Sequence, residues 1–237
     1  RAAKGVPSTA AITPIQFCEK YCQYVDEGYT DVIHVPINKS GSSTYNNALM
    51  AQGMLREERP EHHLNIHLLD PHTYSMVFGW YLCEMARKLQ NGAELRHVIS
   101  EFETQMNKME VILGPYSLKQ MKKSGRISAA AAVMGELMGI RPIITLIDGK
   151  TRVESKVRGD DKVIPAMIDL CKKRTEGVED FDYMIGHTSI PQAAELEKAC
   201  RKAFGKAPLS TFNLGGVVSA NTGPDTLALV YVGKARD

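Results

Sequence analysis

The sequence predicts an α/β protein of two domains, and three observations carry this expectation. At 237 residues the chain is long enough for two domains of ordinary size. Its first part alternates short apolar runs with helical segments, a pattern typical of βαβ units and a parallel sheet. After about residue 107 short strands and a hairpin signal predominate, which favours a mixed or antiparallel sheet. We therefore expect a parallel α/β domain over residues 1–106 and an α+β domain over residues 107–237.

The first domain begins with a helix signal. Thr13-Pro14 matches an N-cap followed by the first helical position, and Gly28 follows the expected helix end near Glu27. The remaining segments of this domain are strands at 31–37 and 64–70, a helix over 44–59 between them, and helices over 74–90 and 93–109 broken at Asn91-Gly92.

The second domain contains a strong hairpin signal at Asp148-Gly149, which joins two strands expected within residues 141–158. Helices are expected at 117–123, ended by Ser124-Gly125, and at 129–138, 162–174 and 191–204. Strands are expected at 111–114, 182–187 and, near the end of the chain, at 210–213, 217–220 and 227–232. We expect the helices to cover one face of this sheet.

Composition and charge exclude several classes of protein. Hydrophobic residues make up 43% and charged residues 24%, which is ordinary for a globular protein. A net charge of +2 gives no electrostatic basis for binding nucleic acid, and no apolar run has the length of a membrane span. The five cysteines have no CxxC spacing and predict reduced thiols in the cytoplasm. Cys18 and Cys22, four residues apart on a helix, are interpreted as core thiols rather than a metal pair.

The loop Ser40-Gly41-Ser42-Ser43-Thr44 lies between a predicted strand and a predicted helix. A helix N-terminus offers unpaired N–H groups and a partial positive charge, so this turn suits an anionic head group. The alternative is an ordinary Ser/Thr N-cap. The loop lacks the GxxxxGK[ST] spacing of a nucleotide-binding loop. Arg126 and Arg158 lie beside a turn and a strand end, where each is either an anion-binding group or a solvated surface residue.

Neither the histidines nor any catalytic motif indicates an enzymatic function. His62, His63 and His67 share no helix face, so we interpret them as surface residues and expect no metal ligands. His34 and His187 are candidate bases without a local nucleophile and orienting carboxylate. Since the chain has no GxSxG or HExxH signature, we expect no catalytic residues and no cofactor.

Five segments resemble motifs of the DegV family, in the family's order and across nearly the whole chain. STAAITPIQF (8–17) resembles T-S-Q-P-S-P-x-x-F, and the segment from Ile37 to Ala48, with SGSSTYNNA, resembles S-x-L-S-G-T-Y-x-S-A. LKQMKKSGRIS (118–128) resembles L-x-x-L-x-x-G-G-R-I-S, and the segment from Ile140 to Arg158 resembles K-P-I-L-x-x-x-x-G-x-I-x-x-x-x-K-x-R. ANTGPD (220–225) resembles the tail motif H-x-G-P-G. Each motif is weak alone, and together they are specific.

The resemblance implies two α/β domains with a lipid tunnel between them. It also implies the lipid-binding subunit of a bacterial fatty acid kinase: the chain would hold a long-chain fatty acid, and a partner kinase would use ATP to phosphorylate its carboxylate. Transient contact with a membrane surface would accompany loading of the lipid.

The resemblance also implies roles for individual residues. Thr9 and Ser42 match the family's head-group Thr and Ser, and Ser43 and Thr44 share the helix start with Ser42. Arg126 matches the Arg of G-G-R-I-S, and Asn221 stands where the family has its tail His. Arg158 matches the Arg near the kinase-facing surface.

Departures from the family pattern keep other functions open. Asn221 cannot carry a charge as the family's His can, Ser43 replaces a Gly, and Asp225 replaces the final Gly. The family's opening strand has no counterpart before Arg1, so we expect an N-terminally incomplete first domain. The alternatives are a storage or transport carrier without a kinase, a dihydroxyacetone-kinase-like enzyme subunit that holds its substrate through a His, and an interaction protein without a ligand.

Overall fold

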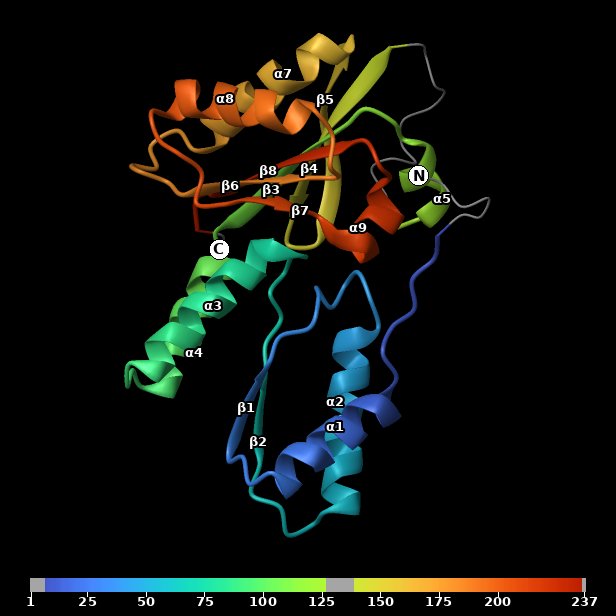
Figure 1. The fold of residues 1–237 in the computed structure, drawn as a ribbon, viewed down its shortest axis with the longest axis vertical. Helices are drawn as coiled ribbons and strands as arrows, with labels where there is room; N and C mark the ends of the chain where they lie inside the picture. The colour runs from blue at the N-terminus through green and yellow to red at the C-terminus, as the bar shows by residue number, and fades with distance from the viewer. Residues whose placement is uncertain (1–6, 127–138, 236–237) are drawn as a thin grey trace. The chain divides into compact units, whose positions relative to one another are not determined.

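The computed structural model describes residues 7–126 and 139–235, and the packing divides the chain into two compact units (Figure 1). The smaller unit is formed by residues 10–74, and the larger by Ser75–Asp237 together with the first nine residues. This division differs from the predicted boundary between residues 106 and 107. The chain joins the larger unit as early as Ser75, whose hydroxyl donates a hydrogen bond to the Leu214 carbonyl at 3.2 Å. The helix expected over 129–138 lies outside the described residues.

The smaller unit is a two-stranded parallel sheet with two helices. The parallel pairing agrees with the prediction, whereas the helices expected over 74–90 and 93–109 belong to the larger unit. In chain order its elements are α1 (Pro14–Asp26), β1 (Asp31–His34), α2 (Thr44–Glu58) and β2 (Asn65–Leu68). Thr13 and Gln16 form a capping box at the start of α1, which agrees with the sequence signal. Strand β1 pairs with β2 from Asp31↔Asn65 to His34↔Leu68. Both strands are shorter than predicted, and Pro36 has no N–H with which β1 could continue its ladder.

Helices α1 and α2 of this unit pack through a small apolar core. The buried side chains of this core are Phe17, Cys18, Tyr21, Cys22, Ala48, Ala51, Leu55 and Leu64. Two of its α2 members are alanines, which allow a close approach of the two helices. This packing fixes the orientation of α2, whose first residues carry the predicted anion-binding turn.

A helical hairpin opens the larger unit. Helix α3 (Met76–Gln90) and helix α4 (Leu95–Met106) are joined at Asn91-Gly92, where the sequence predicts the break. Gly92 has a φ of +83°, a conformation that costs glycine little. Lys88 on α3 donates to Glu101 on α4 at 2.6 Å, so the two helices are also linked at their exposed sides.

The larger unit is built on a six-stranded mixed sheet with the order β5-β4-β3-β8-β6-β7. Its strands are β3 (Met109–Pro115), β4 (Ile140–Ile147), β5 (Lys150–Arg158), β6 (Tyr183–His187), β7 (Thr211–Asn213) and β8 (Thr226–Val232). All neighbours are antiparallel except β6 and β7. Asp148 and Gly149 have φ values of +49° and +71°, as a two-residue type I′ hairpin turn requires. The predicted hairpin and the mixed sheet are confirmed.

Two long helices cover one face of this sheet (Figure 1). They are α7 (Val163–Arg174), preceded by the 3₁₀ turn η1 (Asp160–Lys162), and α8 (Gln192–Phe204). Their buried residues, among them Met167, Cys171 and Leu196, share a core with Ile112 and Leu229 of the central strands. Two short helices, α5 (Lys119–Ser124) and α9 (Gly215–Thr222), complete the described helices of this unit. Because α9 lies on the opposite side of the sheet from α7 and α8, only part of the expected one-sided arrangement is found.

The strand predicted at residues 217–220 is wrong, because these residues form the middle of helix α9. Val217 and Val218 favour strands as isolated residues. Packing overrides this preference: the Gln120 amide of α5 donates to the Ala220 carbonyl at 2.5 Å, and Ser124 donates to the Asn221 carbonyl at 3.2 Å. These bonds satisfy carbonyls at the end of α9 that have no partner within the helix.

A buried carboxylate links strand β3 to its neighbours. Arg174, the last residue of α7, donates to both oxygens of Glu110 at 2.5 and 3.0 Å, and the Tyr231 hydroxyl donates to the same carboxylate at 2.6 Å. Hydrogen bonding to Glu110 is the main cause that raises the pKa of Arg174. Burial, followed by the Glu110 carboxylate, raises the pKa of Tyr231. Three hydrogen bonds therefore satisfy the buried Glu110 carboxylate.

We expect Arg174→Met to lower the free energy of unfolding by roughly 2–3 kcal/mol, because it leaves the Glu110 carboxylate buried without its cation. The loss is smaller than for a fully enclosed pair, since the Arg174 side chain is 29% exposed. Urea unfolding monitored by circular dichroism measures it. The matched control is Arg201→Met, which breaks an exposed pair with Glu197 on α8 and should cost less than about 1 kcal/mol. Equal losses in the two variants would contradict the role of Glu110.

Candidate functional site

The turn before helix α2 carries the predicted head-group residues in the smaller unit. The Ser42 hydroxyl lies 2.7 Å from the Thr44 hydroxyl and accepts a hydrogen bond from the Thr44 N–H at 3.2 Å. Ser43 occupies the N-cap position, but its side chain makes no capping hydrogen bond. The Ser42 and Thr44 hydroxyls therefore lie together at the N-terminus of α2, which the Ser43 side chain does not cap. Hydroxyl groups and uncapped backbone N–H groups at a helix N-terminus suit a carboxylate.

A buried asparagine shapes this turn. Asn38 is 1% exposed, and its Oδ1 accepts hydrogen bonds from the Ser40 N–H at 2.7 Å and the Ser40 hydroxyl at 2.6 Å. Its backbone N–H donates to the Thr73 carbonyl at 3.1 Å. The loop after β1 is thus tied to the loop after β2, at the carboxyl ends of the two parallel strands, where ligands bind in open α/β sheets.

Asp70 is the charged group of the second loop. Its Oδ1 accepts from the His72 N–H at 3.0 Å and the Lys39 N–H at 3.4 Å, and the Lys39 ammonium lies 3.5 Å from Oδ2. Burial, followed by the Asp70 charge, raises the pKa of Tyr74. Asp70 Oδ2 accepts no hydrogen bond from the described residues, but it has ion-pair contacts with Lys39 and, at 3.9 Å, with His72. Among the described residues, the hydroxyl of the buried Thr73 has no hydrogen-bond partner and retains bonding capacity beside the turn.

Gly41 is required by the side chain of Tyr74. A Cβ atom at Gly41 would lie 1.8 Å from the Tyr74 hydroxyl oxygen, far inside contact distance. The tyrosine ring therefore rests on the backbone of the turn that holds Ser42. Together Asn38, Asp70, Thr73 and Tyr74 form a support for this turn that no sequence motif indicates, although Asp70 ends a predicted strand and Thr73 follows three residues later.

Two other predicted residues meet in the larger unit. Ser124, at the end of α5, donates to the Asn221 carbonyl at 3.2 Å, and its hydroxyl accepts from the Arg126 N–H at 3.4 Å. Arg126 and Asn221 thus belong to one junction between α5 and α9. The Asn221 amide donates to the Val217 carbonyl of its own helix at 2.9 Å. The ligand roles of both residues stay predictions.

The remaining predicted residues are placed separately. Arg158 is the exposed last residue of β5, opposite Ile140 on β4. No hydrogen bond or ion pair between described residues joins it to Arg126 or Asn221. Thr9 is exposed in the segment before α1, and the Asn47 amide of α2 donates to the Ile12 carbonyl three residues further on, at 2.7 Å.

The two histidines considered as bases lack an acidic partner within residues 7–126 and 139–235. His34 Nδ1 lies 2.6 Å from the Tyr21 hydroxyl, and burial lowers the pKa of His34. His187 Nδ1 accepts a hydrogen bond from the Ser189 N–H at 3.0 Å. Neither contact gives the orientation by a carboxylate that a catalytic base uses, so nothing at these positions favours the enzyme alternative.

Comparison with known proteins agrees with the resemblance of the sequence motifs to the DegV family. The model of the DegV protein family matches residues 1–234. This chain belongs to the DegV family. A DegV domain-containing protein of Clostridium perfringens is 29% identical over 231 residues, which are 96% of this chain and 78% of that protein. A Staphylococcus aureus relative with the same domain name is 29% identical over 240 residues, covering 98% and 79%.

Solved structures of the family share the fold. A fatty acid binding DegV family protein from Streptococcus agalactiae has a TM-score of 0.83 and 26% identity, with 98% of this chain and 81% of that chain covered. A stearic acid-binding protein from Eubacterium ventriosum has a TM-score of 0.86 at 21% identity, covering 98% and 80%. The predicted α/β fold class with a parallel and a mixed sheet is confirmed.

We expect Gly41→Ala to lower the free energy of unfolding by about 1–3 kcal/mol, because the new methyl group must displace Tyr74 or the turn. Gly53→Ala is the matched control, since Gly53 lies within α2 and a Cβ there meets no atom within 4 Å. That change should instead stabilise the protein by about 0.5–1 kcal/mol through helix propensity. Thermal unfolding compares the two variants, and a Gly41→Ala protein as stable as the wild type would refute the contact with Tyr74.

Proposed function

We propose that this protein binds one long-chain fatty acid and presents its carboxylate to an ATP-dependent kinase subunit, without performing catalysis itself. The observation that carries the proposal is the Ser42–Thr44 helix start, which offers hydroxyls and backbone N–H groups to an anion in a chain of the DegV family. Support comes from the fatty acid binding of the Streptococcus agalactiae protein, which is similar over nearly the whole chain.

Elementary energetics agree with such a carrier. Burial of an alkyl chain contributes about 0.8 kcal/mol per CH₂, so a long chain gives a gross term on the order of 10 kcal/mol. Lost freedom of motion offsets part of this term. The head group then determines orientation more than affinity. We assign it to Thr9, Ser42, Ser43 and Thr44, with Arg126 and Asn221 as further ligand-binding residues.

The setting of the proposed activity is the cytoplasm. All five cysteines are free thiols, which persist in a reducing compartment. No described helix combines the length and the apolar character needed to cross a bilayer. We propose that the acyl chain is taken up during transient contact with a membrane surface and is then carried to the kinase.

Lipid analysis of the purified protein tests the ligand. Organic extraction and mass spectrometry should find about one acyl chain per monomer, as expected for one enclosed pocket. After delipidation, Ser42→Ala combined with Thr9→Val should weaken oleate binding roughly tenfold to a hundredfold per lost hydrogen bond to the carboxylate. Ser100→Ala, an exposed helical serine of α4, should leave affinity unchanged. Absence of lipid together with no uptake of oleate or palmitate would exclude the carrier function.

The kinase step depends on Arg158 in this proposal. Fixed positive charge on an exposed strand end can steer an acidic partner or stabilise a transferring phosphoryl group. We expect Arg158→Ala to slow acyl-phosphate formation with ATP and a DegV-partner kinase while oleate affinity stays nearly intact. Arg152→Ala, an equally charged and exposed change on the same strand, is the control. Loss of oleate binding in Arg158→Ala would place this arginine in the ligand site instead.

Asn221 distinguishes the kinase subunit from a storage or transport carrier. The family's His is replaced here by a residue whose amide already bonds within its own helix. If the wild type supports no acyl-phosphate formation and Asn221→His does, the chain carries lipid without a kinase role. Lipid binding itself should be the same in both proteins.

A further inference from the structure

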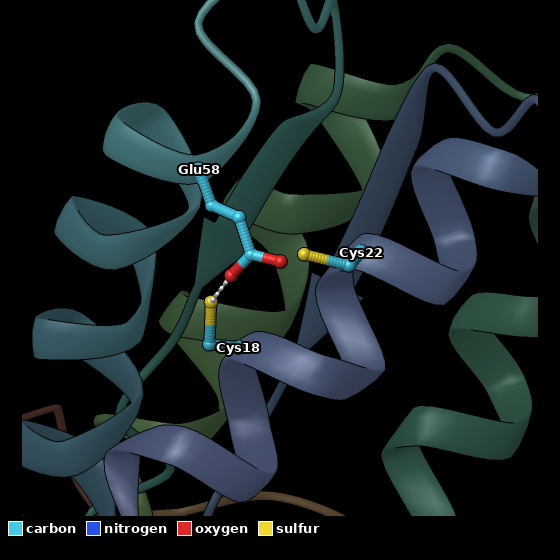
Figure 2. Close-up of side chains that lie close together, drawn as sticks. All are labelled: Cys18, Cys22 and Glu58. Atoms are coloured by element: carbon cyan, nitrogen blue, oxygen red, sulfur yellow. Dashed lines mark hydrogen bonds between the residues drawn. The ribbon is translucent and has the colours of Figure 1, made fainter.

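Two thiols and a carboxylate from distant parts of the sequence meet in the smaller unit, away from the Ser42 turn. Cys18 and Cys22 lie one turn apart on α1, and Glu58 is the last residue of α2. One sulfur atom from each cysteine and one carboxylate oxygen all lie within 4.8 Å of one another. Figure 2 shows both sulfur atoms turned toward the Glu58 carboxylate. The sequence explains the cysteines as core residues, but it does not explain why a carboxylate faces both.

We propose that Cys18, Cys22 and Glu58 form a site for Zn²⁺, with both sulfur atoms and one carboxylate oxygen as ligands and solvent in the fourth position. Zinc accepts mixed sulfur and oxygen ligands in tetrahedral geometry. This proposal replaces the expectation from the sequence that the two cysteines are only core thiols. It is independent of the fatty acid and of the kinase.

The distances suit such an ion. Tetrahedral zinc with Zn–S bonds of about 2.3 Å and a Zn–O bond of about 2.0 Å separates two sulfur ligands by roughly 3.8 Å and sulfur from oxygen by roughly 3.5 Å. The Cys18 sulfur lies 3.7 Å from Glu58 Oε2. The remaining separations are within 4.8 Å, so side-chain movements of at most about 1.3 Å would bring the three ligand atoms to the distances that zinc requires.

The three side chains of the proposed zinc site differ in their exposure to solvent. Cys18 and Cys22 are 2% and 7% exposed, whereas Glu58 is exposed. Solvent and the incoming ion therefore reach the site past the carboxylate. Arg59 follows Glu58 in the sequence, and its guanidinium also lies 4.0 Å from Asp26. Its positive charge compensates part of the net negative charge that two thiolates and a carboxylate leave on a divalent ion.

Zinc binds cysteine as the thiolate, so both thiols must lose their protons. Zinc binding breaks both S–H bonds, forms two Zn–S bonds and releases two protons to solvent, while the carboxylate exchanges no proton. Affinity must therefore rise steeply with pH. The bound ion would replace the weak Cys18–Glu58 hydrogen bond with coordination bonds that link α1 to the end of α2.

The test uses the reduced, metal-free full chain carrying Cys83→Ser, which removes the exposed thiol. Titration with Co²⁺ as a spectroscopic probe should give one ion per chain with sulfur-to-metal charge-transfer absorption, and Zn²⁺ should displace it. Calorimetry in buffers of different ionisation enthalpy should show a release approaching two protons. Adding Cys18→Ser or Cys22→Ser should abolish the charge-transfer band or weaken affinity at least about tenfold. Glu58→Gln, at an exposed position, should weaken binding but keep the band.

Four results would overturn the proposal. A Co²⁺ complex without charge-transfer absorption, or Zn²⁺ binding without proton release, would mean that the thiols are only hydrogen-bonded to Glu58. Binding by the wild type that disappears in the Cys83→Ser chain would assign the ion to the exposed thiol. Unchanged affinity in Glu58→Gln would remove the carboxylate from the site.

Discussion

The buried carboxylate of Glu110 is the constraint on which the larger unit depends. A charged group in the central strand β3 is tolerated only if it is paired and hydrogen-bonded, and its partners come from α7 and from the adjacent strand β8. At the other end of β3, a Cβ atom on Gly114 would lie 2.4 Å from the Met167 sulfur. Helix α7 is therefore fixed against β3 at two places, and the sheet face it covers forms a hydrophobic core with α7 and α8.

Most elements follow from local signals. The Thr13 cap, the Asn91-Gly92 break and the Asp148-Gly149 hairpin each depend on a few adjacent residues, and each is found where the sequence predicts it. Helix α9 could not be predicted in this way, since its conformation depends on bonds to α5, about a hundred residues earlier. The division of the chain near residue 75 likewise reflects long-range packing, such as the hydrogen bond from Ser75 to Leu214, 139 positions later.

The candidate site, too, could be predicted only where its residues are close together in the sequence. Ser42 and Thr44 are recognisable because a hydroxyl-rich turn before a helix has a direct physical meaning. Asn38, Asp70 and Tyr74 act through their contacts with that turn, and these contacts appear only once β1 and β2 are paired. The Cys18–Glu58 contact joins residues 40 positions apart, so no spacing rule applied to α1 alone reveals it.

The two edges of the six-stranded sheet affect how this protein behaves when it is abundant. Within the described residues, one edge is β7, with three residues, and the other is β5, which carries Lys150, Arg152, Lys156 and Arg158. A register shift between Ile143 and Ile144 interrupts the pairing of β4 with β5. Short, charged and irregular edges are poor templates for a strand of another molecule. We therefore expect little strand pairing between molecules at either edge of the sheet, even at high protein concentration.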